Sequence, residues 1–263
     1  SFFNALRNRY LAEDEISKYM KQLTKTNAPY FIRYVFKVNA LKDRGNFYKY
    51  KKSLEENSFG NEIIEFKHGY AHEQRIDTVE SLLDFKRSII DFGCGHGDFA
   101  KRFNHRLEKM GKTYYAIDKD EDMLRIVKKR MKDVDNVIFG TSFPEDLIEG
   151  EDFDVIMSEV IEHMKKDEAA KIVKDILGKQ NVKNLIITTP NKDFNTYFLF
   201  EDEEMRYEDH QFEMGKEEFV KWVGDIVDNR KELNIQFLDI GDKVNSIPLT
   251  LGVRIEKIME KNG

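Results

Sequence analysis

The sequence contains a single cysteine, Cys94, and no apolar run of the roughly 18 residues that a membrane-spanning helix needs. One thiol cannot form a disulfide within the chain, and the lack of cysteine pairs is typical of proteins from reducing compartments. The first residues also lack the apolar segment of a secretory signal. These absences together predict a cytoplasmic protein that does not contact a membrane.

Charge is abundant in the sequence but unevenly distributed. Residues 1–60 hold 12 Lys and Arg against 6 Asp and Glu, whereas the remaining residues hold 31 against 43. The first segment is also rich in aromatic residues at helical spacing. We therefore expect a basic, aromatic-rich helical extension over residues 1–66 and a main domain over residues 67–263. Such an extension can contact a polyanion, dock a protein partner, or form an ordinary solvated face.

From residue 88 onward, short apolar runs alternate with helical patterns. This alternation is typical of a doubly wound α/β domain with a mainly parallel sheet. Strands are predicted over residues 88–92, 113–118, 136–141, 153–158 and 182–189, with closing strands over residues 233–239 and 250–258. Helices are predicted over about residues 71–85, 97–109, 159–177 and 217–227, with a further helix that ends near residue 132.

A glycine-rich loop follows the first predicted strand. Gly93 and Gly95 let the chain turn sharply and allow a ligand to approach the backbone. Asp91 would lie at the carboxyl end of this strand. Asp118 would end the next strand, where an acidic side chain can accept hydrogen bonds from both ribose hydroxyls. The spacing is not that of a dinucleotide-binding loop, and no P-loop lysine follows, which disfavours nucleoside triphosphate hydrolysis.

The pattern D-x-G-x-G-x-G at residues 91–97 resembles the first motif of S-adenosylmethionine-dependent methyltransferases. This resemblance implies a seven-stranded class I fold in which the seventh strand is antiparallel and inserted before the sixth. It also implies that S-adenosylmethionine is the cofactor. The residues expected to bind it are Asp91, Gly93, Gly95, Asp118 and, on the adenine side, Ser142.

Residues 158–163 (SEVIEH) carry a spaced set of metal-type ligands. On a helix that begins at Glu159, the side chains of Glu159, Glu162 and His163 would share one face. His210 is a candidate fourth ligand, and two carboxylates with two imidazoles suit a cation of Mg, Mn, Fe or Zn character. The alternative is an ordinary polar helix start, because carboxylates favour helix N-termini. The position directly after the fourth strand, beside the expected cofactor, favours the metal site.

Four segments together resemble the RNA 3′-terminal 2′-O-methyltransferases, which protect plant and animal small RNAs and have bacterial relatives in RNA repair. The segments are residues 91–95 (DFGCG), 159–163 (EVIEH), 189–191 (TPN) and 206–213 (RYEDHQFE). The resemblance, which spans about residues 68–255, implies a catalytic Mg²⁺ or Mn²⁺. Its ligands would be Glu159, Glu162, His163 and His210. The candidate substrate contacts would be Gln74, Arg75, Asn191 and Arg206.

The resemblance implies methyl transfer to the 2′-hydroxyl of the last nucleotide of an RNA, with a kinase-phosphatase or an RNA ligase as candidate partners. A metal that binds the 2′- and 3′-oxygens together would select a terminal ribose with both hydroxyls free. Two features depart from the family: Met214 and Gly215 replace its usual Trp-Thr pair, and residues 1–66 have no counterpart in the resemblance. Methylation of a small vicinal diol and a scaffold role in an RNA-processing complex are the alternative functions.

Overall fold

The computed structural model describes residues 68–144, 150–198, 205–207, 209–244 and 246–258. The chain divides into two compact units: one comprises residues 67–193 and 207–263, and the other residues 1–66 and 194–206. The helical extension predicted over residues 1–66 lies outside the described residues, and the predicted division into domains stays a prediction. The fold described below is that of the larger unit.

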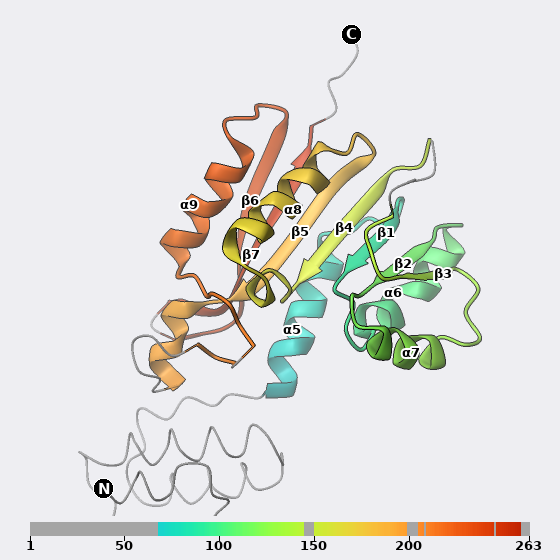
Figure 1. The fold of residues 1–263 in the computed structure, drawn as a ribbon, viewed down its shortest axis with the longest axis horizontal. Helices are drawn as coiled ribbons and strands as arrows, with labels where there is room; N and C mark the ends of the chain where they lie inside the picture. Colours follow the sequence, from blue (N-terminus) through green and yellow to red (C-terminus); the bar gives the residue numbers. More distant parts are fainter. Residues whose placement is uncertain (1–67, 145–149, 199–204, 208, 245, 259–263) are drawn as a thin grey trace, which may run out of the picture. The chain divides into compact units, whose positions relative to one another are not determined.

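A seven-stranded sheet forms the centre of this unit (Figure 1). Its strands are β1 (Ser88–Phe92), β2 (Tyr114–Ile117), β3 (Val137–Gly140), β4 (Phe153–Ser158), β5 (Val182–Pro190), β6 (Leu233–Val244) and β7 (Ile247–Lys257). Their order is β3-β2-β1-β4-β5-β7-β6, with β1 to β5 parallel and β7 antiparallel to both of its neighbours. The predicted class I methyltransferase fold, with an antiparallel seventh strand beside the fifth, is confirmed.

Helices cover both faces of the sheet. They are α5 (His68–Ser81), α6 (Asp98–Lys109), α7 (Glu121–Arg130), α8 (Lys166–Gly178) and α9 (Lys216–Val227). One buried apolar cluster joins the sheet to α5, α6 and α7, and a second joins its other face to α8 and α9. Adjacent strand residues point to opposite faces, so Ile89 belongs to the first cluster and Ile90 to the second. Burial on both faces explains why the parallel strands are continuous apolar runs.

Several predicted boundaries differ from the structure, and three of them are informative. The first helix ends at Ser81 rather than near Phe85, which is buried with a φ of 60° that no helix allows. The closing strands, predicted over residues 233–239 and 250–258, are longer at their connection, because the pairing of β6 with β7 extends to Val244 and Ile247. The helix predicted from residue 159 begins only at Lys166, for reasons that concern the site itself.

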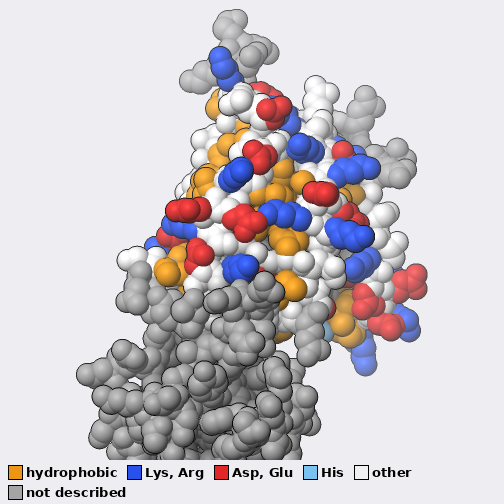
Figure 2. Space-filling model, turned by 60° about the vertical axis from the view of Figure 1, so that its left-hand side comes forward, with side chains coloured by type: hydrophobic (Ala, Val, Ile, Leu, Met, Phe, Trp, Pro, Cys, Tyr) orange, Lys and Arg blue, Asp and Glu red, His pale blue; other side chains and the backbone are white. Residues whose placement is uncertain are grey.

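The surface of the domain mixes charges of both signs. On the face in Figure 2, the coloured Lys and Arg side chains alternate with Asp and Glu side chains. Among the described residues, Asp239 of β6 accepts hydrogen bonds from both Lys216 and Lys243 at 2.7 and 2.9 Å. This face therefore offers no continuous basic track among the described residues. Within those residues, no helix combines the length and apolar character needed to cross a membrane.

Candidate metal and cofactor site

The glycine loop between β1 and α6 depends on backbone conformations that favour glycine. Gly93, Gly95 and Gly97 have φ values of 81°, 49° and 75°. A Cβ at Gly93 would lie 2.4 Å from Val160, and one at Gly97 would lie 2.6 Å from Val127. At Gly95 nothing lies within 4 Å of that position. Two glycines therefore permit close packing, while the third presents its backbone to open space where a ligand can approach.

Asp118, directly after β2, is hydrogen-bonded to this loop. Its Oδ2 accepts a hydrogen bond from the Gly95 N–H at 2.9 Å, and its Oδ1 accepts one from the Asp120 N–H at 2.9 Å. Each oxygen has a second lone pair, so the carboxylate can still accept hydrogen bonds from a ribose. Ser142 is exposed after β3, and the Asp118 N–H donates to Gly140 O at the same edge of the sheet. This arrangement fits a nucleoside that lies across the ends of β1, β2 and β3.

Asp91 lies in β1, just before the glycine loop. Its side chain is buried and accepts a hydrogen bond from the Tyr114 hydroxyl at 2.5 Å. Burial raises the pKa of Asp91 to about 7, the Tyr114 hydrogen bond opposes this rise, and the charges of Asp118 and Asp98 add to it. The predicted cofactor contact of Asp91 stays a prediction, because the described contacts tie the carboxyl to the protein interior.

The raised pKa of Asp91 predicts how stability depends on pH. Below its ordinary pKa of 3.8, Asp91 is protonated in both the folded and the unfolded protein and does not affect stability. As the pH rises from there to the folded-state pKa of about 7, the unfolding free energy falls, because only the unfolded protein loses the proton readily. A rise from 3.8 to about 7 corresponds to roughly 4 kcal/mol. We therefore expect Asp91→Asn, which retains an acceptor for Tyr114, to lose much less stability than wild type between pH 5 and 8. Urea unfolding at several pH values without added cofactor measures the unfolding free energies, and Asp135→Asn, at an exposed position, is the control. Equal losses of unfolding free energy in wild type and Asp91→Asn would contradict the prediction.

The turn after β4 positions the metal-type ligands. Glu159 has a φ of 55°, which ends the strand and is incompatible with a helix start. Ile161–His163 then form a single 3₁₀ turn, η1, whose Ile161 is fully buried in the core. The predicted helix over residues 159–177 is wrong in its first part, and so is the idea of one shared helical face. The 3₁₀ turn, anchored by Ile161, replaces it.

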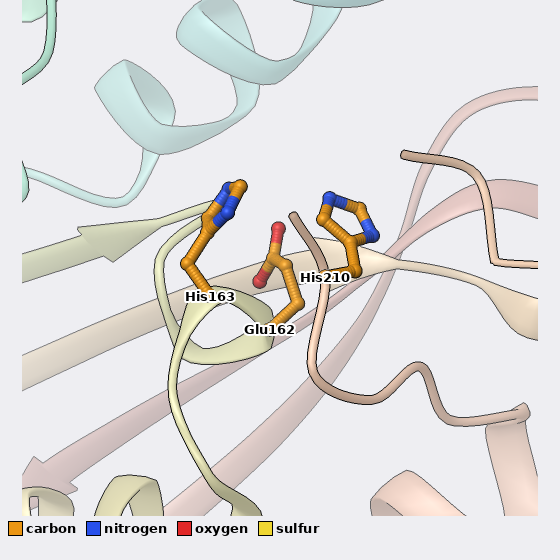
Figure 3. Close-up of side chains that lie close together, drawn as sticks. All are labelled: Glu162, His163 and His210. Carbon is orange, nitrogen blue, oxygen red and sulfur yellow. The ribbon is translucent and has the colours of Figure 1, made fainter. Parts of the chain in front are cut away.

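Three of the four predicted ligands come together. Glu162, His163 and His210 each offer a ligand atom, and these atoms lie within 4.8 Å of one another (Figure 3). The centroids of the two imidazole rings are 4.9 Å apart, and the ring planes make an angle of 85°. The segment that carries His210 is fixed to the turn by a 2.7 Å hydrogen bond from the Gln211 N–H to the Glu162 carbonyl. Backbone pairing thus unites ligands that are distant in the sequence.

The Glu162 carboxylate has the environment of a cation ligand. Its side chain is buried; Oε2 accepts a hydrogen bond from Thr189 at 3.1 Å, but Oε1 is buried with no hydrogen-bond partner. Burial raises the pKa of Glu162 well above its usual range, and the nearby charge of Glu159 raises it further. A cation beside this oxygen would compensate the buried charge. One carboxylate and two imidazoles suit Mn²⁺, Zn²⁺ or Mg²⁺, so these residues fit a divalent metal.

Glu159 lies outside this group of three. Its Oε1 accepts a hydrogen bond from the Thr188 hydroxyl at 3.0 Å, and its Oε2 pairs with Arg75 Nη1 at 3.4 Å. Arg75, from α5, also contacts His72 Nδ1 at 2.9 Å. The predicted ligand and the predicted substrate residue therefore lie beside each other, and Glu159 stays a proposed fourth ligand.

The other predicted substrate residues have different surroundings. Gln74 lies near Gly241 of β6, since a Cβ there would be 3.4 Å from Gln74 Oε1. Asn191 is buried and donates to the Pro248 carbonyl at 2.8 Å, which indicates a role in holding the loop after β5. Arg206, in the smaller unit, donates to Asn195 Oδ1 through Nε and Nη2 at 3.2 and 3.0 Å. Their substrate contacts stay predictions.

Sequence reasoning missed several residues of the site. Thr188 and Thr189 donate to the two glutamates, although only Thr189 belongs to a quoted motif. Tyr207 is half exposed, with its ring 5.1 Å from that of His210. Met214, which replaces the family tryptophan, is fully buried in the core and is thus excluded from stacking on a substrate. Two adjacent hydroxyl residues at the end of the buried strand β5 were the available signal for the threonines.

Two family models match separate parts of the chain. The Methyltransferase domain model matches residues 89–178, and the Hen1 N-terminal domain model matches residues 1–59. The chain is 29% identical over 213 residues to the small RNA 2′-O-methyltransferase of Caenorhabditis elegans. The chain is therefore similar to the small RNA 2′-O-methyltransferases, or Hen1 proteins. The predicted resemblance is confirmed, whereas the expectation that residues 1–66 have no counterpart in the Hen1 family is wrong.

The matches to these relatives include a larger share of this chain than of the relatives themselves. The C. elegans match includes 74% of this chain and 44% of that protein. The Drosophila melanogaster small RNA 2′-O-methyltransferase is 26% identical, with 65% of this chain and 49% of the relative covered. The chain therefore spans less than half the length of these two curated relatives.

Solved Hen1 structures match as well. A chain in the structure of the Pnkp1/Rnl/Hen1 RNA repair complex is 27% identical, with a TM-score of 0.61, and the match covers 95% of this chain and 57% of that one. The methyltransferase domain of a bacterial Hen1 protein, at 23% identity and a TM-score of 0.58, supports the fold, covering 71% of this chain and 99% of that domain. Together with the domain match, this fold supports S-adenosylmethionine as the cofactor, while its contact with the glycine loop stays a prediction.

Asp118→Ala should weaken the binding of S-adenosylhomocysteine about 10- to 100-fold. The substitution removes the anchor of the Gly95 N–H and the proposed ribose acceptor, and hydrogen bonds to charged groups contribute about 1.5–3 kcal/mol. Asp120→Ala is the matched control, because Asp120 caps α7 through the Asp122 and Met123 N–H groups. It should lower stability by about 1 kcal/mol and leave binding unchanged. Calorimetric titration measures both variants, and equal affinities would refute the role of Asp118.

Proposed function

We propose that this chain methylates the 2′-oxygen of the 3′-terminal nucleotide of RNA, with S-adenosylmethionine as methyl donor and Mg²⁺ or Mn²⁺ as metal cofactor. The observation that carries the proposal is the buried Glu162 carboxylate, whose Oε1 has no hydrogen-bond partner beside two imidazoles. Val160, two residues earlier, packs against Gly93 of the cofactor loop. This packing supports a methyl donor site next to the metal cluster, as methyl transfer to a ribose oxygen held at the metal requires.

The residue types suit this reaction. A ribose 2′-hydroxyl is a weak acid, and a bound divalent metal would stabilise the negative charge that develops on its oxygen. Glu162, His163 and His210 would hold the metal, with Glu159 as the fourth ligand. Arg75 balances the charge of Glu159 at the edge of the cluster. Recognition of both terminal hydroxyls by one metal would select RNA ends without reading base sequence.

The N-terminal segment and the RNA repair partners form a second part of the proposal. The repair-complex chain matches nearly the whole of this chain, and the Hen1 N-terminal domain model matches residues 1–59. We infer that residues 1–66 form a separate extension that serves association with an RNA end-healing kinase-phosphatase and an RNA ligase. In that setting, methylation would mark an RNA end during repair.

The decisive experiment offers the protein labelled S-adenosylmethionine, Mn²⁺ or Mg²⁺, and a short RNA. The same RNA is tested after periodate oxidation of its terminal diol, with a 2′-deoxy 3′-terminal nucleotide, and with a 3′-phosphate. We expect transfer to the untreated RNA alone, and none when EDTA replaces the metal.

The outcomes separate the alternatives. Efficient methylation of the oxidised RNA, or of an internal 2′-hydroxyl, would refute recognition of the terminal diol. Methylation of catechol but not of RNA would instead favour a small-diol substrate. Transfer that persists in EDTA would refute the metal part of the proposal while leaving the cofactor site intact.

A further inference from the structure

Both imidazoles of the metal cluster contact a carboxylate through the same ring nitrogen. His210 Nδ1 lies 2.6 Å from Glu213 Oε1, and His163 Nδ1 lies 3.1 Å from Asp209 Oδ2. The two carboxylates come from one short segment on either side of His210. A neutral imidazole has one N–H and one lone pair, and a carboxylate can only accept a hydrogen bond. Each pair therefore favours the proton on Nδ1 and leaves the lone pair on Nε2.

We propose that Glu213 and Asp209 are positioning residues that hold both imidazoles in the tautomer required for metal binding through Nε2. This inference rests on the metal site of the proposed function. Such a hydrogen bond orients a ligating imidazole, fixes its tautomer and raises its basicity. The segment around His210 thus supplies one ligand and the carboxylates that orient both histidines.

Burial makes the two pairs unequal. The side chains of His210 and Glu213 are 2% and 0% exposed, whereas those of His163 and Asp209 are 35% and 72% exposed. Water can replace an exposed acceptor, but it cannot readily replace a buried one. The backbone hydrogen bond between Gln211 and Glu162 holds this segment against η1, so the Glu213 pair is fixed relative to the cluster. Glu213 should therefore contribute more than Asp209.

Metal titration tests the proposal. Mn²⁺ binding is measured by electron paramagnetic resonance for wild type, Glu213→Gln, Asp209→Asn and the control Glu217→Gln, which removes an exposed charge on α9. We expect Mn²⁺ affinity to fall about 10- to 100-fold in Glu213→Gln. It should fall less than about 10-fold in Asp209→Asn and stay unchanged in Glu217→Gln. Wild-type affinity in Glu213→Gln would overturn the main inference and leave the proposed function standing. No binding in wild type would overturn both.

The histidine tautomers can be measured directly, and they distinguish a positioning role from a purely structural ion pair, which does not require a particular neutral tautomer. In ¹⁵N-histidine-labelled wild-type protein, two-bond proton–nitrogen spectra identify which nitrogen carries the proton, and His210→Gln and His163→Gln assign the two signals. We expect the Nδ1–H form for both residues, and loss of that preference for His210 in Glu213→Gln. An Nε2–H form of His210 in wild type would overturn the proposal even if every Glu213 variant failed to fold. Thermal unfolding and S-adenosylhomocysteine binding confirm that the variants compared are folded.

Discussion

Glu162→Gln should reduce methyl transfer at least about 1000-fold while leaving the affinity for S-adenosylhomocysteine within about twofold of wild type. Glu162 supplies the only negative charge within the group of three ligand residues. Metal stabilisation of a developing oxyanion is worth several kcal/mol, which corresponds to about this change in rate. Glutamine has nearly the same shape and retains an acceptor for the Thr189 hydroxyl, so the turn should keep its structure.

The same substitution should stabilise the protein when no metal is present. Burial and the charge of Glu159 raise the pKa of Glu162 far above its usual range. The ionised form therefore costs stability as pH rises through the ordinary glutamate range, and glutamine removes that cost. We expect Glu162→Gln to unfold at a higher temperature than wild type in EDTA at pH 8. This opposition between activity and stability is characteristic of a functional site.

Three measurements check the Glu162 prediction: transfer to RNA with Mn²⁺, cofactor titration, and thermal unfolding in EDTA. Exposed Glu168→Gln, on α8, serves as the control for charge removal and should behave as wild type. His210→Ala should also abolish transfer without loss of cofactor binding. Activity in Glu162→Gln close to that of wild type would exclude the cluster as the metal site. Loss of cofactor binding would mean that the substitution disturbs the fold instead.

The sheet could be predicted closely because its strands are buried on both faces. The strand at residues 153–158 has the predicted limits, and β5 extends the predicted strand by a single residue, Pro190. Each is a short apolar run bounded by polar or turn-forming residues, a local signal that tertiary packing reinforces. The glycine loop was predictable for a similar reason, since few other residues adopt its left-handed backbone.

The turn that carries the metal ligands could not be predicted from local sequence. The pattern of residues 159–177 predicted one helix, because carboxylates directly after a strand suit a helix start. The structure instead places Glu159 in a left-handed conformation, packs Val160 against Gly93 and buries Ile161. These are tertiary contacts, and they override a local helical preference.

The composition of the site was predictable only in part. The family resemblance placed His210 near Glu162, although no periodic pattern connects them. The ion pair between Glu159 and Arg75 required the relative position of α5 and β4, which the sequence alone does not specify. Glu213 was visible in a motif, but its role depends on a buried side-chain distance.

Gly93→Ala should weaken both cofactor and metal binding, because Gly93 packs against Val160 between the proposed cofactor loop and the turn that carries the proposed metal ligands. The added Cβ would lie 2.4 Å from Val160 Cγ2, at a residue with a φ of 81°. A left-handed non-glycine residue costs about 1–2 kcal/mol, and overpacking costs about 1–3 kcal/mol more. We expect a loss of roughly 2–5 kcal/mol in unfolding free energy. Displacement of Val160 should also shift η1, and with it Glu162 and His163.

Gly97→Ala is the matched control that separates local strain from coupling between the sites. Gly97 has a φ of 75°, and an added Cβ would lie 2.6 Å from Val127 Cγ1, so the substitution imposes a similar strain. Val127, however, lies on α7 and not on the turn that carries Glu162 and His163. Both variants should lose stability, while Mn²⁺ affinity should fall only in Gly93→Ala. Val160→Ala in the Gly93→Ala background should restore much of the metal affinity, because it removes the clash and leaves only the backbone strain. If both glycine variants lowered Mn²⁺ affinity equally, general destabilisation would explain the effect, and packing of Val160 on Gly93 would not couple the two sites.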